Sequence, residues 1–174
     1  MMESCHRYGI PMHVVSGGIN DIIEGCFETI IESNEIGSES AIKCWENMGV
    51  FSNEFHYHNE KTISFSKPVI HCLNKKEFLY NENTFKKFRK NVIIMGDLIE
   101  DIGMACTKSH DNILKIGFLN NLKKNGDKLG PYLENYDIII AGDGNLNIVS
   151  YLMQKLFDKV DNNVLYDVSQ TQGF

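Results

Sequence analysis

Short apolar runs alternate with longer amphipathic stretches along most of this chain. The apolar runs with the length of strands are residues 13–15, 48–51, 69–73, 92–95, 113–116 and 138–140. Helices are predicted over residues 19–32, 83–90, 98–105 and 145–157, and helical spacing of apolar side chains is clearest in the first and last of these. Strands that alternate with helices are typical of a parallel sheet with helical crossovers, so the pattern predicts an α/β fold.

Two segments depart from this alternation. Residues 55–65 alternate around a polar centre at 59–61, which predicts a β-hairpin inserted into the α/β pattern. The C-terminal helix is expected to bury one face and to give way, from Asp158, to a polar tail with a loose end. The apolar residues of that face are Ile148, Val149, Leu152 and Leu156.

Composition narrows the class of protein. The chain has 174 residues, 43% hydrophobic and 23% charged, which indicates one ordinary globular domain. A net charge of −6 argues against nucleic acid or an anionic membrane as the main partner, and no apolar run is long enough for a membrane span. The five cysteines include no C-x-x-C pair, and the N-terminus lacks a signal-peptide stretch, so we expect reduced thiols in the cytoplasm. Composition does not predict the oligomeric state.

Two carboxylates follow one of the predicted strands. The run at 92–95 ends in Gly96 and Asp97, and Asp101 comes four residues later. Open α/β sheets bind ligands at the carboxyl ends of their strands, and Mg²⁺ near a phosphate prefers carboxylate oxygens. The alternative is that Asp97 only caps the following helix.

Two other segments could contribute polar chemistry at strand ends. Ser16, Gly17 and Gly18 precede a predicted helix, where a hydroxyl and backbone N–H groups can bind phosphate. Lys75 and its neighbour Lys76 follow the run at 69–73, where a lysine could neutralise phosphoryl oxygens. Taken separately, the first segment could be a simple turn with an N-cap and the second a surface lysine pair.

The order of these segments resembles a known family. Ser-Gly-Gly, then a lysine, then G-D-x-x-x-D is the order of three motifs in the haloacid dehalogenase phosphatases. The flanking sequence is similar to the cytosolic pyrimidine 5′-nucleotidases, called type III, from about residue 9 to residue 157. The matching stretches are VVSGGINDIIE, FSNEF, LNK, GDLIED, ILKIGFLN, NYDIII and the final helix.

The resemblance implies a fold and a set of roles. Residues 1–157 would be part of a Rossmann-like, haloacid dehalogenase-type core, and residues 158–174 a tail. Ser16 would bind the substrate phosphate, with Gly17 and Gly18 in the backbone cradle. Lys75 would bind the phosphate and act in catalysis, while Asp97 and Asp101 would hold Mg²⁺. The implied reaction is hydrolysis of nucleoside 5′-monophosphates, pyrimidine nucleotides above all, in the cytoplasm.

Parts of the family pattern are absent from this sequence. The attacking aspartate of these enzymes lies on a D-x-D-x-T segment, which occurs nowhere here, and most of the cap is also missing. The absent first strand would lie between the serine strand and the Asp97 strand, leaving their edges unpaired. Leu98 and Glu100 replace a serine and a glycine that are common in the family. We therefore expect little or no activity from this chain alone.

Two alternatives remain open. One is a non-catalytic remnant that binds phosphate, a nucleotide or a partner protein. The other is a receiver-like domain that takes a phosphoryl group on Asp97, although the serine-before-lysine order fits that class poorly.

Overall fold

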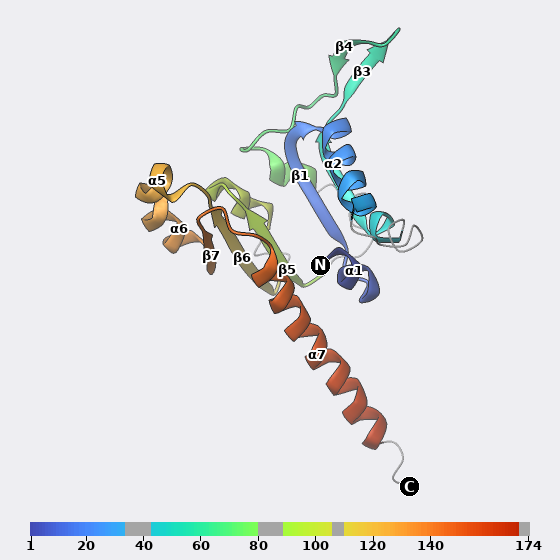
Figure 1. The fold of residues 1–174 in the computed structure, drawn as a ribbon, viewed down its shortest axis with the longest axis vertical. Coiled ribbons are helices and arrows are strands. Elements are labelled where there is room, and N and C mark those ends of the chain that lie inside the picture. The colour runs from blue at the N-terminus through green and yellow to red at the C-terminus, as the bar shows by residue number, and fades with distance from the viewer. Residues whose placement is uncertain (34–42, 80–88, 106–109, 171–174) are drawn as a thin grey trace.

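The chain builds two parallel sheets, a separate hairpin and one long C-terminal helix (Figure 1). A computed structural model describes residues 1–33, 43–79, 89–105 and 110–170. The helices are α1 (Met2–Arg7), α2 (Asn20–Ser33), α4 (Lys75–Leu79), α5 (Leu122–Asn125), α6 (Leu129–Asn135) and α7 (Asn147–Gln170), with 3₁₀ helices η1 (Ile99–Met104) and η2 (Gly126–Lys128). The strands are β1 (Met12–Ile19), β2 (Met48–Asn53), β3 (Phe55–His58), β4 (Lys61–Phe65), β5 (Asn91–Gly96), β6 (Asn112–Leu119) and β7 (Ile138–Ala141).

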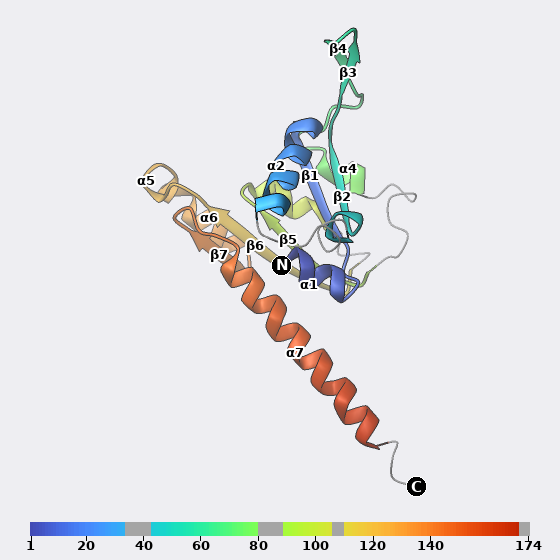
Figure 2. The same ribbon diagram turned by 45° about the vertical axis from the view of Figure 1, so that its right-hand side comes forward.

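The strands pair as the alternation of strands and helices predicts. β1 pairs with β2 in one parallel sheet, and β5, β6 and β7 form a second parallel sheet in that order. The antiparallel hairpin β3–β4 projects away from both sheets (Figure 2). The predicted α/β fold, with parallel strands flanked by helices and a hairpin insertion, is confirmed.

The two parallel sheets are not joined by backbone pairing. Among the strands that the structure describes, β1 has β2 on one edge and β5 has β6 on one edge, and β1 and β5 do not pair with each other. A strand edge carries N–H and C=O groups that can pair with another extended segment.

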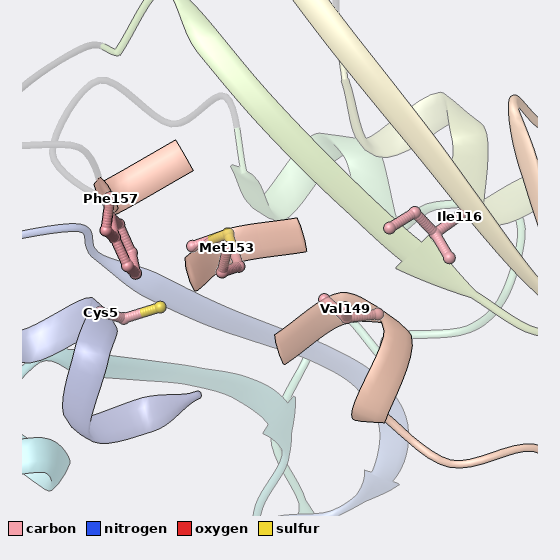
Figure 3. Packing of buried hydrophobic residues seen from close by; sticks show 5 residues of the cluster. All are labelled: Cys5, Ile116, Val149, Met153 and Phe157. Atoms are coloured by element: carbon pink, nitrogen blue, oxygen red, sulfur yellow. The ribbon is translucent and has the colours of Figure 1, made fainter. Parts of the chain in front are cut away.

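One hydrophobic cluster holds the two sheets in place. Figure 3 shows its buried side chains, which come from α1, β6 and α7: Cys5, Ile116, Val149, Met153 and Phe157. The ring of Tyr8, just after α1, stacks on Phe157 with centroids 4.0 Å apart. Met12 of β1 and Ile93 of β5 pack against the same cluster, so contacts between side chains, and not backbone pairing, link the sheets here.

Helix α7 differs from its predicted form in two ways. Its buried face carries Val149, Met153 and Phe157, whereas Ile148 and Leu156 are 43% and 51% exposed, so the predicted face is rotated. The helix also continues to Gln170 instead of ending at Phe157. No glycine or proline lies between residues 145 and 170, so nothing in the backbone ends the helix where the polar tail begins. In the described ranges, no helix is long and apolar enough to cross a membrane.

Several other predicted elements change. Residues 69–73 are not a strand, because the backbone of Ile70 bonds to the side chain of Asn53 instead of to a neighbouring strand. The helix predicted over residues 98–105 is the shorter 3₁₀ helix η1. β1 runs through residues 16–18 to Ile19, and α2 begins at Asn20. The helix predicted at 83–90 falls mostly on residues outside the described ranges, and Arg89 and Lys90 are not helical.

We expect Phe157→Ala to lower the free energy of unfolding by about 3 kcal/mol, because it leaves a cavity where the ring packs against Tyr8. Leu156→Ala, on the exposed face of the same helix, is the matched control and should cost less than about 1 kcal/mol. Urea unfolding of both variants measures the difference. Equal losses would show that α7 does not bury the Phe157 face.

Candidate active site

The predicted site residues lie at the carboxyl ends of parallel strands. Ser16 is near the end of β1, and Asp97 directly follows β5. Lys75 begins α4, which packs against both β1 and η1. The structure therefore connects the serine segment, the lysine and the acidic segment through α4, at the edge where open α/β sheets place their ligands.

A buried ion pair is the closest contact among these residues. The Nζ of Lys75 lies 2.7 Å from Oδ1 of Asp101, and the two side chains are 15% and 2% exposed. The other carboxylate oxygen of Asp101 accepts the N–H of Leu98 at 3.2 Å, and the N–H of Asp101 donates to the carbonyl of Leu98 at 3.1 Å. Asp101 thus binds the lysine and closes the first turn of η1. Lys76, the other lysine considered, is exposed.

Gly96 is needed because Asp101 occupies the space beside it. A Cβ atom built on Gly96 would lie 2.5 Å from both Cβ and Oδ2 of Asp101. No ordinary side chain could be placed there without moving the carboxylate. The glycine of the G-D-x-x-x-D motif therefore leaves room for the last aspartate of the motif, Asp101.

Asp97 is exposed and does not cap the following helix. The N-cap position of η1 is Leu98, and the carboxylate that accepts the N–H at this end belongs to Asp101. The helix-cap interpretation of Asp97 is therefore wrong. Its peptide carbonyl accepts a hydrogen bond from the hydroxyl of Tyr132, and the next carbonyl, of Leu98, accepts one from Tyr136.

The serine segment has a fixed shape of its own. The hydroxyl oxygen of Ser16 accepts the N–H of Gly18 at 3.0 Å, at the point where the pairing of β1 with β2 becomes irregular. A Cβ atom on Gly17 would lie 3.3 Å from the carbonyl oxygen of Ile70. The serine segment and the segment leading to Lys75 are therefore in close contact.

Asn53 binds those two segments to each other. Its Nδ2 donates to the carbonyls of Gly17 and Ile70, each at 3.0 Å, and its Oδ1 accepts the N–H of Ile70 at 2.8 Å. The sequence contained Asn53 in a matching stretch but gave no sign of this role. Tyr132 and Tyr136 were missed for the same reason, since their partners lie far away along the chain.

A small cavity lies beside the ion pair. Its volume is about 180 Å³, and Cys72, Leu73, Lys75, Lys76, Glu100 and Gly103 line it. Pockets that enclose small-molecule ligands usually measure about 300–1,000 Å³. Ser16 and Asp97 are not among the lining residues, so this cavity is adjacent to the site and does not enclose a nucleotide.

The carboxylates fit part of a Mg²⁺ site. In the described ranges, no group of three or more His, Cys, Asp or Glu side chains is placed to hold a metal ion. Both oxygens of Asp101 already bind protein donors, which leaves Asp97 as the exposed carboxylate of the pair. Because Mg²⁺ often takes one or two carboxylates and completes its shell with waters and substrate phosphate, this donor set is compatible with it.

Comparison with known proteins identifies the family. Residues 1–157 match the family described as pyrimidine 5′-nucleotidase (UMPH-1), and the chain belongs to it. The 7-methylguanosine phosphate-specific 5′-nucleotidase of Gallus gallus is 30% identical over 88% of this chain and 50% of its own length. The protein of that name in Homo sapiens is 32% identical over 88% of this chain and 49% of its own length.

A solved structure agrees with this assignment. Cytosolic 5′-nucleotidase IIIB bound to cytidine superposes with a TM-score of 0.71 at 26% identity, covering 94% of this chain and 52% of that one. The chain spans about half the length of the curated relatives it matches.

Gly96→Ala should lower the free energy of unfolding by about 1–3 kcal/mol, because its methyl group would collide with the Asp101 carboxylate. Gly25→Ala is the control, since a Cβ atom there meets nothing within 4 Å and alanine favours helix α2. Thermal unfolding of both variants measures the effect. A neutral Gly96→Ala would contradict the packing of Asp101 on this glycine.

Lys75→Met should cost about 3 kcal/mol of stability, because it leaves the Asp101 carboxylate buried without its cation. Lys76→Met, at the exposed neighbouring position, should change stability by less than about 0.5 kcal/mol. Urea denaturation compares the two. Matching losses from both lysines would mean that the ion pair is not what holds α4 against η1.

Proposed function

We propose that this chain is the phosphate- and metal-binding part of a Mg²⁺-dependent 5′-nucleotidase. The reaction converts a nucleoside 5′-monophosphate and water into a nucleoside and phosphate. The observation that carries the proposal is the buried Lys75–Asp101 pair, which lies beside Asp97 and links it to the strand of Ser16. Membership of the family supports the same reaction.

Each residue has a role that its position supports. The hydroxyl of Ser16 and the backbone N–H groups of Gly17 and Gly18 would bind phosphoryl oxygens. Lys75 would neutralise negative charge on the phosphoryl group while Asp101 holds its ammonium group in place. Asp97 would be the direct Mg²⁺ ligand. When bound, Mg²⁺ would polarise the phosphoryl oxygens and stabilise the charge that develops on them.

The attacking carboxylate would come from a segment outside this sequence. Among the strands that the structure describes, β1 and β5 each pair on one edge only, which supports this, because an extended segment paired with both would end beside Ser16 and Asp97. Without that segment the chain would bind phosphate but turn over little or no substrate.

The substrate would be a nucleoside monophosphate in the cytosol. The family description favours a pyrimidine base, as does the cytidine bound to the similar structure. The relatives named for 7-methylguanosine phosphate make that nucleotide the competing substrate. Neither Ser16 nor Asp97 lines the cavity beside Lys75, so base selection would depend on residues elsewhere in the whole protein.

A second candidate is a phosphate- or nucleotide-binding protein with no turnover. Leu98 favours it, because an apolar side chain at that position cannot bond to phosphate or to a metal-bound water. Exposed Glu100 adds negative charge next to Asp97 and would weaken phosphate binding.

Titration calorimetry with inorganic phosphate, CMP and 7-methyl-GMP tests the binding step. We expect Mg²⁺-dependent binding by the chain, reduced at least about 10-fold in Asp97→Asn because a direct metal ligand is lost. Asp127→Asn removes an exposed carboxylate from η2 and should leave the affinity unchanged. Equal binding by wild type and Asp97→Asn would reject Asp97 as the ligand.

A fusion tests the catalytic step. The part of the human relative that this chain does not match would be joined to the chain in the order that it has in that relative. The fusion should release phosphate from CMP or 7-methyl-GMP only with Mg²⁺, and Asp97→Asn should abolish release. A folded fusion that binds phosphate without releasing it would favour the non-catalytic protein.

A further inference from the structure

Two tyrosines bind the backbone around Asp97 from one side. The hydroxyl of Tyr132 donates to the carbonyl of Asp97, and the hydroxyl of Tyr136 donates to the carbonyl of Leu98. Tyr132 lies on α6 and Tyr136 is the C-cap residue of that helix. Two consecutive carbonyls of the Asp97 loop (residues 96–98) are therefore held by side chains one helical turn apart.

The tyrosines lie in a space that the fold provides for them. They are 4% and 5% exposed, and their ring centroids lie 5.3 Å apart within the cluster that contains Leu119. A Cβ atom on Gly117 would lie 2.6 Å from the Tyr136 ring, so only glycine leaves room for it. Gly117 pairs with Gly96 across β5 and β6. Gly117 leaves room for the ring of Tyr136, and Gly96 leaves room for the side chain of Asp101.

Both hydroxyls keep their protons at neutral pH. Burial raises the pKa of Tyr132 and of Tyr136, and the nearby carboxylates, Asp97 and Asp101 among them, raise it further. A raised pKa favours the neutral phenol, which is the hydrogen-bond donor.

Hydrogen bonds therefore hold both the carbonyl groups and an N–H group of the loop. The tyrosines bind its carbonyls, and the Asp101 carboxylate accepts the N–H of Leu98. The side chain of Asp97 is exposed, while its backbone carbonyl is hydrogen-bonded to Tyr132. Groups that orient a metal ligand typically change metal affinity by about 10–100-fold when they are removed.

We infer that Tyr132 and Tyr136 are positioning residues that aim the Asp97 carboxylate at the metal, an inference that rests on the proposed function. They act through the loop backbone and contact neither phosphate nor metal. The tyrosines are distinct from the Lys75–Asp101 ion pair, because they bind backbone carbonyls of residues 97 and 98 and come from a later part of the chain.

Phenylalanine substitutions test the inference, since they remove only the hydroxyl groups. We expect Tyr132→Phe and Tyr136→Phe to bind Mg²⁺ about 10-fold more weakly, measured by calorimetry, and to exchange the amide hydrogens of residues 97–99 about 10-fold faster. Amide exchange in β6 should not change. Tyr151→Phe, at a 54% exposed position on α7, is the control and should match wild type in both measurements.

The two measurements separate the inference from the proposed function. If wild type binds no Mg²⁺, the metal site falls, and faster exchange in residues 97–99 alone would still support positioning of the loop. Unchanged exchange in that segment would overturn the inference, whatever the metal result. If wild type does bind Mg²⁺, lower stability or a looser loop with unchanged Mg²⁺ affinity would also overturn it, since the tyrosines would then be purely structural.

A measurement on the wild-type chain applies if either variant fails to fold. A buried hydroxyl held in a hydrogen bond exchanges its proton slowly and gives a separate nuclear magnetic resonance signal. Such signals for Tyr132 and Tyr136, with contacts to residues 97–99, would support the inference. Their absence would overturn it.

Discussion

Asp101 contacts α4 through Lys75, the Asp97 loop through Leu98, and the end of β5 at Gly96. Its ion pair with Lys75 is the contact on which the arrangement depends. A carboxylate that is 2% exposed is costly to bury, and its oxygens are satisfied by one ammonium group and one backbone N–H. Those bonds join α4 to η1 and close the first turn after the Asp97 loop. Asp101, which was expected to support the metal, therefore stabilises the local structure through these bonds. Its value to catalysis would come from holding Lys75 and Leu98 in place.

The same constraint explains how the site can form between two sheets that do not pair. β1 and β5 share no backbone hydrogen bonds, so nothing in the sheets themselves sets the separation of Ser16 and Asp97. The cluster around Phe157 holds both sheets by packing. At the carboxyl ends of the strands, Asn53 binds the serine segment to the segment before Lys75, and Lys75 binds Asp101. These polar bonds and the apolar packing around Phe157 together replace a shared ladder.

Periodicity predicts most of the fold, because burial on one face leaves a repeating pattern that survives in the sequence. β5, β6, β7 and the hairpin follow it closely. It fails at residues 69–73, where asparagine side chains and not a neighbouring strand satisfy the backbone. It also misplaces the buried face of α7, since apolar side chains occur on two sides of that helix and only packing selects one. The order of motifs singled out Lys75 and Asp101 separately, one for phosphate and one for metal, and their ion pair with each other was not expected. Asn53, Tyr132 and Tyr136 could not be found in this way, because a contact between residues 35 or more apart has no local pattern.

The departure of the GDLIED segment from its family form can be judged from what each position does. The side chain of Leu98 is exposed, and the hydrogen bonds at this position come from its N–H and its carbonyl. Any residue other than proline supplies those groups, so replacing serine by leucine keeps the Asp97 loop in its shape while removing a hydroxyl from the surface. Glu100 is likewise exposed and lines the cavity beside Lys75, where it adds charge without disturbing the ion pair. The substitutions therefore change the chemistry that a phosphate would meet and leave the scaffold intact. The effect of these two residues would therefore fall on phosphate binding and turnover, and not on the shape of the Asp97 loop.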